Sequence, residues 1–420
     1  MEIKIIGAGL AGCEAAYYLS KYQKVKLYEM KPLLKSPAHK TDLFAELVCS
    51  NSFKNTLLTS ASGLLKAEMQ LLNSLIMKAA YYAQVPSGDA LSVDREIFSA
   101  YITQEIKNNK NIEIINQEVI NISSEDITII ATGPLTSDNL SKSINKLLGD
   151  SLYFYDAAAP IIHINGIDLN KCYYKSRYDH SPADYLNCPF NKEEFFNFYK
   201  ELIKAQRVPL KTFEKEINYE GCLPIEVIAK RGFKTLTFGP MKPVGLDNGD
   251  KPYAVVQLRQ DNIGKDLFNM VGFQTNLTYT EQKRVFSLIP GLKDIQIVRY
   301  GLMHRNTYIK SPLYLTQHLN LKSNPLIFFA GQIVGVEGYL ESASMGIIAG
   351  INALKLLQKK ELIDFPNNTI IGSLLFYISN SSMKTFSPMG ANYGILQTNT
   401  KDKQLISEES LASIQLWKNI

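Results

Sequence analysis

The sequence predicts an α/β fold built on a parallel sheet, and its first thirty residues carry most of that prediction. Residues 3–6 (IKII) form a short, mostly apolar run of the kind found in buried parallel strands. A glycine-rich turn follows, and residues 14–19 are Ala-rich with apolar positions on one face, as in a helix. Residues 25–29 (VKLYE) complete a strand–helix–strand unit of about 30 residues, the usual size of a βαβ unit. Further along, the pattern predicts one helix over 64–82 and a strand over 119–122.

Later segments of the chain can complete the sheet that this unit begins. One strand ends at Gly133, and another, residues 326–330, runs into a glycine-rich segment and then a helix. The middle of the chain is richer in aromatic residues and mixed in pattern. We therefore expect residues 1–160 and 301–420 to form one domain, with residues 161–300 inserted as a smaller α+β domain.

Length and composition agree with a folded chain of more than one domain. The chain has 420 residues, of which 45% are hydrophobic and 20% charged. This balance excludes a largely disordered, collagen-like or coiled-coil protein. Lys and Arg outnumber Asp and Glu by 45 to 40, so the net charge is +5, which is compatible with one basic face.

Cysteine usage and hydropathy point to the same compartment. The five cysteines include no CxxC pair and have no regular spacing, and an odd number in a large chain favours a reducing cytoplasm. No apolar run approaches the ~20 residues that span a bilayer, and the first residues lack the layout of a signal peptide. We therefore expect a cytoplasmic protein that is not associated with a membrane.

The glycine turn carries a dinucleotide-binding fingerprint. Gly7, Gly9 and Gly12 fit the pattern G-x-G-x-x-G between a strand and a helix. The first glycine permits a tight turn, the second lets the backbone approach a pyrophosphate, and the third lets the helix pack on the strand. The helix N-terminus adds free N–H groups and the positive end of its dipole. The residues expected to bind the cofactor here are Gly7, Ala8, Gly9, Leu10, Ala11 and Gly12.

An acidic residue defines which dinucleotide suits the turn. Glu29 ends the second strand, 17 residues after Gly12. A carboxylate there accepts hydrogen bonds from both ribose hydroxyls and repels a 2′-phosphate. FAD or NAD is therefore favoured over NADP at this position.

Two further glycine segments favour FAD over NAD. Gly133 follows a strand, and Gly331 and Gln332 open the run GQIVGVEG at the carboxyl edge of the expected sheet, where ligands of α/β proteins bind. Tyr339 comes directly after this run and is either a stacking partner for a flavin or a base, or a core aromatic. The predicted fold class is therefore an FAD-binding, Rossmann-like domain of the glutathione-reductase type with an inserted smaller α+β domain.

Two cysteines and one polar cluster are candidates for chemistry. Cys49 and Cys222 lie in AELVCSNSF and YEGCLPIEV, and Lys230 and Arg231 follow the second within nine residues. Nearby cations favour a reactive thiolate, whereas the alternative for each cysteine is an inert buried thiol. Residues 304–307 (HRNT) either bind a phosphate or carboxylate or form a satisfied polar turn. The five histidines show no metal-ligand spacing, so no metal is predicted.

The longer motifs resemble the TrmFO family of folate- and FAD-dependent RNA (uracil-C5)-methyltransferases, which is related to the MnmG flavoproteins. The resemblance runs nearly end to end. It rests on GAGLAGCEAA, KPLLKSPAHKTDLFAELVCSNSF, SGDALSVDR, EGCLPIEV, RYGLMHRNTYI and GQIVGVEGYLESASMGIIAG. The segment TFSPMGANYGIL matches the family's pattern loosely, with departures at Ser387, Gly390 and Tyr393.

The resemblance implies a particular reaction. The family takes a carbon unit from 5,10-methylenetetrahydrofolate, and FAD reduced by NAD(P)H accepts the methylene and supplies the reducing equivalents. The usual target is the uridine of the tRNA T-loop, which becomes 5-methyluridine. Some members act instead on a uridine of 23S rRNA, and the departures noted above leave that alternative open. The resemblance does not define the oligomeric state.

The family's two functional cysteines fall on Cys49 and Cys222. We interpret Cys222 as the thiolate that adds to C6 of uracil, because this addition makes C5 enolate-like. Cys49 is the candidate base for the C5 proton, or a supporting thiol. Two other hypotheses are a plain flavin oxidase or reductase, and a non-catalytic RNA-binding protein in which FAD is a structural prop.

Overall fold

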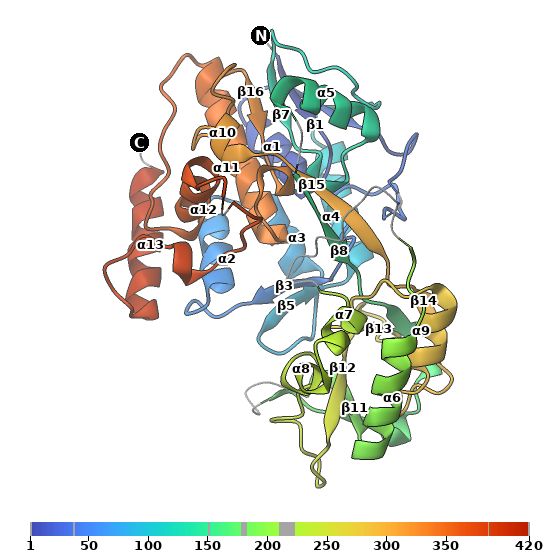
Figure 1. Ribbon diagram of the computed structural model, residues 1–420. Coiled ribbons are helices and arrows are strands. Elements are labelled where there is room, and N and C mark those ends of the chain that lie inside the picture. The colour runs from blue at the N-terminus through green and yellow to red at the C-terminus, as the bar shows by residue number, and fades with distance from the viewer. Residues whose placement is uncertain are drawn as a thin grey trace.

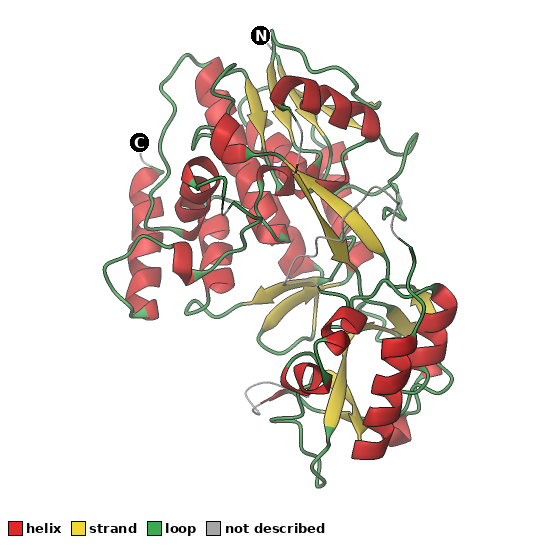
Figure 2. Cartoon of the chain, in the orientation of Figure 1, coloured by secondary structure: helices red, strands yellow, loops and turns green. Residues whose placement is uncertain are grey.

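The structure is a computed structural model whose described residues form two large sheets, each with its own hydrophobic core, and two smaller ones (Figure 1). The described residues are 2–36, 38–149, 152–177, 183–209, 223–384 and 386–418, without the side chains of 152–155, 304 and 305. In Figure 2 the parallel sheet lies at one end of the molecule and the antiparallel sheet at the other, with helices against both. This mixed α/β architecture confirms the predicted fold class.

The first sheet is fully parallel, as the βαβ pattern predicted. Its order is β16-β7-β1-β2-β6. The strands are β1 (Ile3–Ile6), β2 (Val25–Glu29), β6 (Ile112–Asn116), β7 (Ile127–Ile130) and β16 (Ile327–Phe329). β1 has neighbours on both sides, so the glycine turn after it opens at the carboxyl edge of the sheet, where α/β proteins bind ligands.

Two helices pack closely on each other beside this sheet. They are α1 (Leu10–Leu19) and α11 (Tyr339–Leu357). A Cβ atom at Gly346 would lie 2.1 Å from the carbonyl oxygen of Ala11, so only glycine allows the helices to come this close. α11 is long and apolar enough to cross a membrane by length and composition alone, contrary to the prediction that no apolar run approaches such a length. However, 83% of its apolar window is buried in the protein. The apolar character of α11 is therefore explained by its place in the core.

The other elements around the parallel sheet are mostly helical. They are α2 (Ala61–Leu71), α3 (Leu75–Tyr82), α4 (Arg95–Lys107), α5 (Asp138–Leu148), α10 (Ser311–Tyr314), α12 (Ile370–Asn380), α13 (Lys403–Trp417) and a small sheet of β3 (Ser52–Asn55), β5 (Ala90–Val93) and β4 (Gln84–Val85). The single helix expected over 64–82 was wrong. Asn73 adopts φ +59°, which ends α2, and the Ser74 side chain then caps α3. Residues 119–122 form no strand.

Buried carboxylates cap two of these helices. Glu14 in α1 accepts hydrogen bonds from the backbone N–H groups of Leu75 and Ile76 at the start of α3 (3.0 and 2.9 Å). Glu68 in α2 accepts from the N–H groups of Ile370 and Ile371 at the start of α12 (2.7 and 3.0 Å). Each carboxylate therefore occupies the positive end of a helix dipole contributed by a distant part of the chain.

Replacing Glu68 by Gln should change how stability depends on pH. Burial raises the pKa of Glu68 from its ordinary 4.5 to about 7, so the stabilising contribution of this group is complete below pH 4.5 and is lost as pH rises through 7. Relative to Glu68→Gln, the unfolding free energy of the wild type should fall by about 2–3 kcal/mol between pH 5 and pH 8. Urea unfolding of both proteins across this pH range measures the difference in their unfolding free energies. A difference that does not change with pH would contradict a raised pKa of Glu68.

The second sheet is antiparallel and lies wholly within residues 161–299. Its order is β10-β11-β12-β13-β9-β14. The strands are β9 (Ile161–His163), β10 (Tyr173–Tyr174), β11 (Tyr185–Phe190), β12 (Ala254–Gln260), β13 (Leu267–Met270) and β14 (Ile297–Arg299). Its helices are α6 (Lys192–Lys204), α7 (Ile225–Lys230), α8 (Phe233–Phe238) and α9 (Tyr279–Phe286).

An antiparallel pair of strands links the two sheets. β8 (Leu152–Ala157) pairs with β15 (Met303–Tyr308) along six residue pairs, and Figure 1 shows this ribbon running from one part of the molecule to the other. The chain thus leaves the first sheet and returns to it through neighbouring strands. The domain boundaries at 160 and 300 stay a prediction.

Candidate cofactor and thiol site

Close packing within the chain explains the glycine at two of the three fingerprint positions. A Cβ atom at Gly12 would lie 1.8 Å from the carbonyl oxygen of Gly7, and Gly7 itself has φ +99°. At Gly9, which precedes α1, an added Cβ would meet only the carbonyl oxygen of Ala131, at 3.9 Å. The chain itself therefore requires glycine at positions 7 and 12 but not at position 9. A ligand that approaches the turn would account for the third glycine, so binding at Gly9 stays a prediction.

The turn faces an open cleft. Its lining brings together four of the residues singled out from the sequence, which are Gly7, Ala8, Gly9 and Glu29. It also includes residues that the sequence did not reveal, among them Gln117, Glu118, Val119, Thr132, Leu135, Thr136 and Ser137. Leu10, Ala11 and Gly12 lie behind the cleft in α1. Val119, the first residue of the predicted strand 119–122, is thus part of the cleft wall.

Glu29 also fixes the turn that it faces. Its two carboxylate oxygens accept hydrogen bonds from the backbone N–H groups of Ala8 (2.8 Å) and Lys31 (3.0 Å). Each oxygen has a second lone pair that can accept a hydrogen bond from a ribose hydroxyl. The carboxylate is buried, so it is held rigidly beside the glycine turn.

The two later glycine segments lie at the ends of β7 and β16. Gly133 has φ +65° and Gly331 has φ +87°, and an added Cβ at Gly331 would lie 3.0 Å from Cβ of Ala11. Gln332 donates a hydrogen bond from Nε2 to Oε2 of Glu337 (2.5 Å). Burial, and next the negative charge of Asp156, raise the pKa of Glu337 to about 8. A carboxyl group that is largely protonated at neutral pH therefore lies in this segment, which the sequence did not indicate.

Tyr339 connects the end of this segment to the Cys49 loop. Its hydroxyl oxygen accepts hydrogen bonds from the backbone N–H groups of Cys49 (3.0 Å) and Ser50 (3.1 Å). Its ring packs against Phe53, with 5.6 Å between the ring centroids. The structure therefore joins two sites that the sequence treated as separate. Stacking of Tyr339 on a flavin or a base stays a prediction.

Cys49 is partly buried, and its thiol donates to the carbonyl oxygen of Ala157 (3.8 Å). Ala157 ends β8, the strand that leads from the first sheet towards the inserted one. The thiol is therefore neither sealed in the core nor fully exposed, and it lies where the two parts of the molecule meet.

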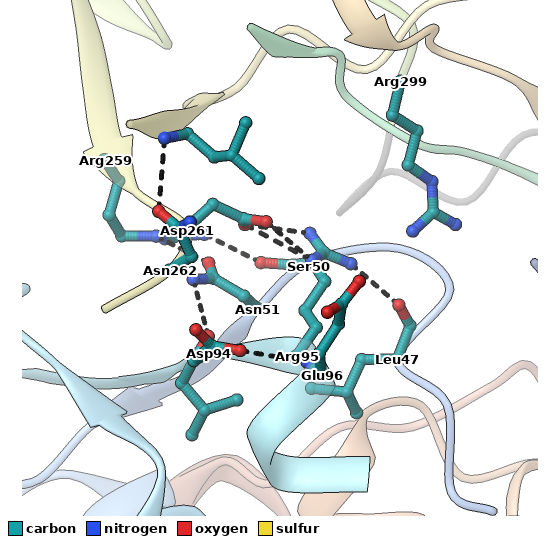
Figure 3. Close-up of polar contacts among 12 residues, drawn as sticks. Leu47, Ser50, Asn51, Asp94, Arg95, Glu96, Arg259, Asp261, Asn262 and Arg299 are labelled. Atoms are coloured by element: carbon teal, nitrogen blue, oxygen red, sulfur yellow. Dashed lines mark hydrogen bonds and ion pairs between the residues drawn. The ribbon is translucent and has the colours of Figure 1, made fainter. Parts of the chain in front are cut away.

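Three arginines from three elements hold the Cys49 loop, residues 47–51. Figure 3 shows contacts of Arg95 and Arg259 with this loop and the position of Arg299. Arg95 donates to the carbonyl oxygens of Leu47 (2.8 Å) and Cys49 (3.2 Å). Arg259 donates to the side-chain oxygens of Ser50 (2.9 Å) and Asn51 (3.0 Å). Arg299, in β14, donates a hydrogen bond from Nη2 to the backbone carbonyl oxygen of Val48 in the same loop (2.8 Å).

Arg95 is itself oriented by a buried carboxylate. Asp261 accepts hydrogen bonds from Nε (3.1 Å) and Nη2 (3.3 Å) of Arg95, and the two side chains are only 4% and 11% exposed respectively. A forked guanidinium between a carboxylate and two carbonyls has a defined orientation, which lysine cannot reproduce. Arg95 ends the motif SGDALSVDR, but nothing in the local sequence indicates that Arg95, Arg259 and Arg299 meet at one loop.

Cys222 lies outside the described residues, but both flanks of its segment are anchored near Cys49. The N–H of Val208 donates to the carbonyl oxygen of Asn276 (2.8 Å), and the N–H of Ile225 donates to that of Gln274 (2.6 Å). Between them, the N–H of Thr275 donates to the carbonyl oxygen of Ala158 (3.4 Å). Ala158 follows Ala157, which accepts the hydrogen bond of the Cys49 thiol, so the described residues on either side of this segment are anchored next to the strand end that Cys49 contacts.

The remaining candidates are less defined. His304 and Arg305 lie in β15, but their side chains fall outside the described part of the chain. Lys230 and Arg231 end α7 at the surface. Among the described residues, no group of three His, Cys, Asp or Glu side chains is arranged to hold a metal ion.

A parallel sheet with a glycine turn, an acidic residue on the second strand and a cleft at its carboxyl edge defines a dinucleotide-binding protein of the flavoprotein type. Comparison with known proteins narrows this class. The chain belongs to the TrmFO family and, through residues 2–361, to the wider family described as glucose inhibited division protein A. This membership confirms the resemblance seen in the sequence.

The relatives match over nearly their whole length. The chain is 56% identical over 401 residues to the methylenetetrahydrofolate–tRNA-(uracil-5-)-methyltransferase TrmFO of Acetivibrio thermocellus, covering 94% of this chain and 92% of that protein. It is also 56% identical, with the same coverage, to the protein of that name from Bacillus subtilis. Among solved structures, Aquifex aeolicus GidA matches with a TM-score of 0.70 at 16% identity, over 100% of this chain and 75% of that one. This likeness shows the fold alone.

Proposed function

We propose that this protein is a cytoplasmic FAD-dependent RNA (uracil-C5)-methyltransferase. It takes its carbon unit from 5,10-methylenetetrahydrofolate, uses NAD(P)H as reductant and makes 5-methyluridine in the T-loop of tRNA. The observation that carries the proposal is the bond between Tyr339 and the backbone of Cys49, because it joins a candidate catalytic thiol to the third glycine segment of a flavoprotein fold. The names of the close relatives support the same activity.

The residues of the cleft fit FAD. The N–H groups at the start of α1 can bind the pyrophosphate, and Glu29 can accept hydrogen bonds from the ribose. Packing within the chain does not require glycine at position 9, and the absence of a side chain there leaves the backbone accessible to the cofactor. When bound, FAD supplies the redox chemistry, and the protein's part is to bind, orient and exclude water.

The two cysteines have separate roles in this proposal. Uracil C5 is a weak nucleophile, and a thiolate that adds to C6 makes C5 enolate-like. We assign this addition to Cys222, and we assign removal of the C5 proton, or support of the step, to Cys49. The shared anchoring of the Cys222 flanks and the Cys49 loop near Ala157 and Ala158 supports a common chamber.

The substrate is an RNA base that must leave its stack to reach the thiols, at a cost of a few kcal/mol. A T-loop uridine is the main candidate because the relatives are named for tRNA. A uridine of 23S rRNA is the alternative, since Ser387, Gly390 and Tyr393 depart from the family pattern. Both RNAs therefore belong in the test.

The test is methylation by the FAD-bound protein with labelled 5,10-methylenetetrahydrofolate, NADPH and transcripts of tRNA or a 23S rRNA fragment. We expect label in 5-methyluridine of the tRNA. Cys222→Ala should abolish this label while NADPH still reduces the flavin. Cys172→Ala serves as the control, because Cys172 is a partly buried cysteine that directly precedes β10. Methylation by Cys222→Ala would overturn the assigned role. If the protein binds RNA but NADPH does not reduce its flavin, the result would favour the non-catalytic hypothesis.

A further inference from the structure

Residues 227–246 of the inserted part form a concentrated basic segment. The segment contains Lys230, Arg231, Lys234 and Lys242 but no Asp or Glu. The first three of these side chains are exposed. In a chain whose net charge is only +5, this segment concentrates positive charge on α7, α8 and the loop that follows them. It therefore has the charge that phosphate groups require.

An aromatic side chain projects from the same segment. Phe238, the last residue of α8, is 78% exposed, the highest value among the large apolar side chains of the described residues. The helix does not depend on it for anchoring. Phe233 packs on Phe196, with 5.2 Å between centroids, and Leu236 is fully buried. The Phe238 ring is thus left available for an external partner.

Hydrogen bonds from two basic side chains fix the conformation of the loop after α8. Arg177 donates hydrogen bonds to the carbonyl oxygens of Val244 and Lys242 (2.7 Å each), and Lys175 donates to that of Asp247 (2.9 Å). Arg177 and Lys175 lie on a different part of the chain, beside β10. The surface that carries Phe238 is therefore supported by the body of the inserted part rather than being a free tip.

This surface lies close to the proposed reaction chamber along the chain. α7 begins at Ile225, three residues after Cys222, and is anchored to Gln274 beside the Ala158 contact. α7 and α8 have six residues each, so each is about 9 Å long. A nucleic acid with one base in the chamber can therefore extend its neighbouring nucleotides across this surface.

We propose that this basic face, defined as Lys230, Lys234, Lys242 and Phe238, binds the RNA substrate next to the target uridine. The lysines contact phosphates, and Phe238 stacks on an unpaired base. Aromatic rings among cations are the usual platform for unstacked bases, because every base offers a π-face. This inference rests on the proposed function and adds the place where the RNA lies.

The test is binding of a tRNA transcript to the full-length, FAD-bound protein, measured by fluorescence anisotropy at several salt concentrations. Phe238→Ala should weaken binding about 5- to 150-fold, and Phe238→Trp should restore it. Lys234→Ala should reduce the slope of log affinity against log salt by about 0.7–0.9. Unchanged flavin absorbance and melting temperature show that the variants are folded.

Two matched controls lie away from the basic face. Tyr82→Ala removes another exposed aromatic ring, in α3, and Lys360→Ala removes an exposed cation after α11. Both should bind the transcript like the wild type. Wild-type affinity and salt slope in Phe238→Ala and Lys234→Ala would overturn the inference, as would an effect seen only with anionic lipid vesicles.

The experiments distinguish an error in the inferred RNA-binding face from an error in the proposed function. If the wild type makes 5-methyluridine but the variants bind and methylate equally well, the basic face is not the RNA site and the enzyme assignment stands. If the wild type methylates no RNA, the proposed function fails. Binding by the variants then shows separately whether this face contacts RNA.

Discussion

Gly12→Ala is expected to prevent stable folding of the cofactor domain. The new Cβ would lie 1.8 Å from the carbonyl oxygen of Gly7, and neither backbone segment can retreat without breaking the packing of α1 on β1. Overpacking typically costs about 1–3 kcal/mol, and a contact this short with backbone atoms places the change at the upper end of that range. Thermal unfolding and the yield of FAD-bound protein measure the loss.

Gly9→Ala is the matched control for this prediction. Its Cβ has room within the chain, with the nearest atom at 3.9 Å, so the apoprotein should unfold at nearly the wild-type temperature. Its affinity for FAD should nevertheless fall, because the methyl group occupies the space in front of the turn. A Gly12→Ala protein that folds and binds FAD normally would contradict the packing argument, and normal FAD affinity of Gly9→Ala would contradict the cofactor site.

Arg95→Ala is expected to reduce both stability and methylation. The change leaves the buried carboxylate of Asp261 without its partner and removes the donors to the carbonyls of Leu47 and Cys49. Loss of one partner from a buried ion pair costs about 3–5 kcal/mol. Displacement of the thiol loop should also lower kcat about 100-fold, since an error of about 1 Å in position has that effect.

A double variant separates the two effects. Arg95→Ala with Asp261→Asn removes the uncompensated charge, so stability should largely return while kcat stays low. Arg284→Ala is the control for loss of an arginine, because its ion pairs with Glu281 and Glu201 are largely exposed and should contribute below about 1 kcal/mol. Full activity of the double variant would show that the arginine does not position the loop.

The sequence predicted those parts of the fold that depend on neighbouring residues. The turn at Gly7, Gly9 and Gly12 and the strands on either side form one local unit, so spacing alone indicated both the sheet and its ligand edge. The helix break at Asn73 was missed because residues on both sides of it have helical periodicity. That break is stabilised by Glu14, which is 60 residues from Ser74 in sequence.

The arginines around Cys49 illustrate what the sequence does not reveal. Arg95, Arg259 and Arg299 come from three elements, and each has the appearance of an ordinary charged residue in its local sequence. Only the tertiary structure brings them to one loop. Tyr339 was recognised as a candidate, but its bond to the Cys49 backbone joins positions 290 residues apart and could not be inferred from spacing.

The origin of two of these arginines has a mechanical consequence. Arg259 and Arg299 belong to the antiparallel sheet, whereas the loop that they hold belongs with the parallel one. Any hinge motion that separates the sheets would pull these donors from the loop and release the sulfur from its fixed position. The Cys49 thiol, our candidate catalytic group, therefore keeps this position only while the two halves are docked, and we expect a substrate that binds one half to influence the position of the thiol in the other.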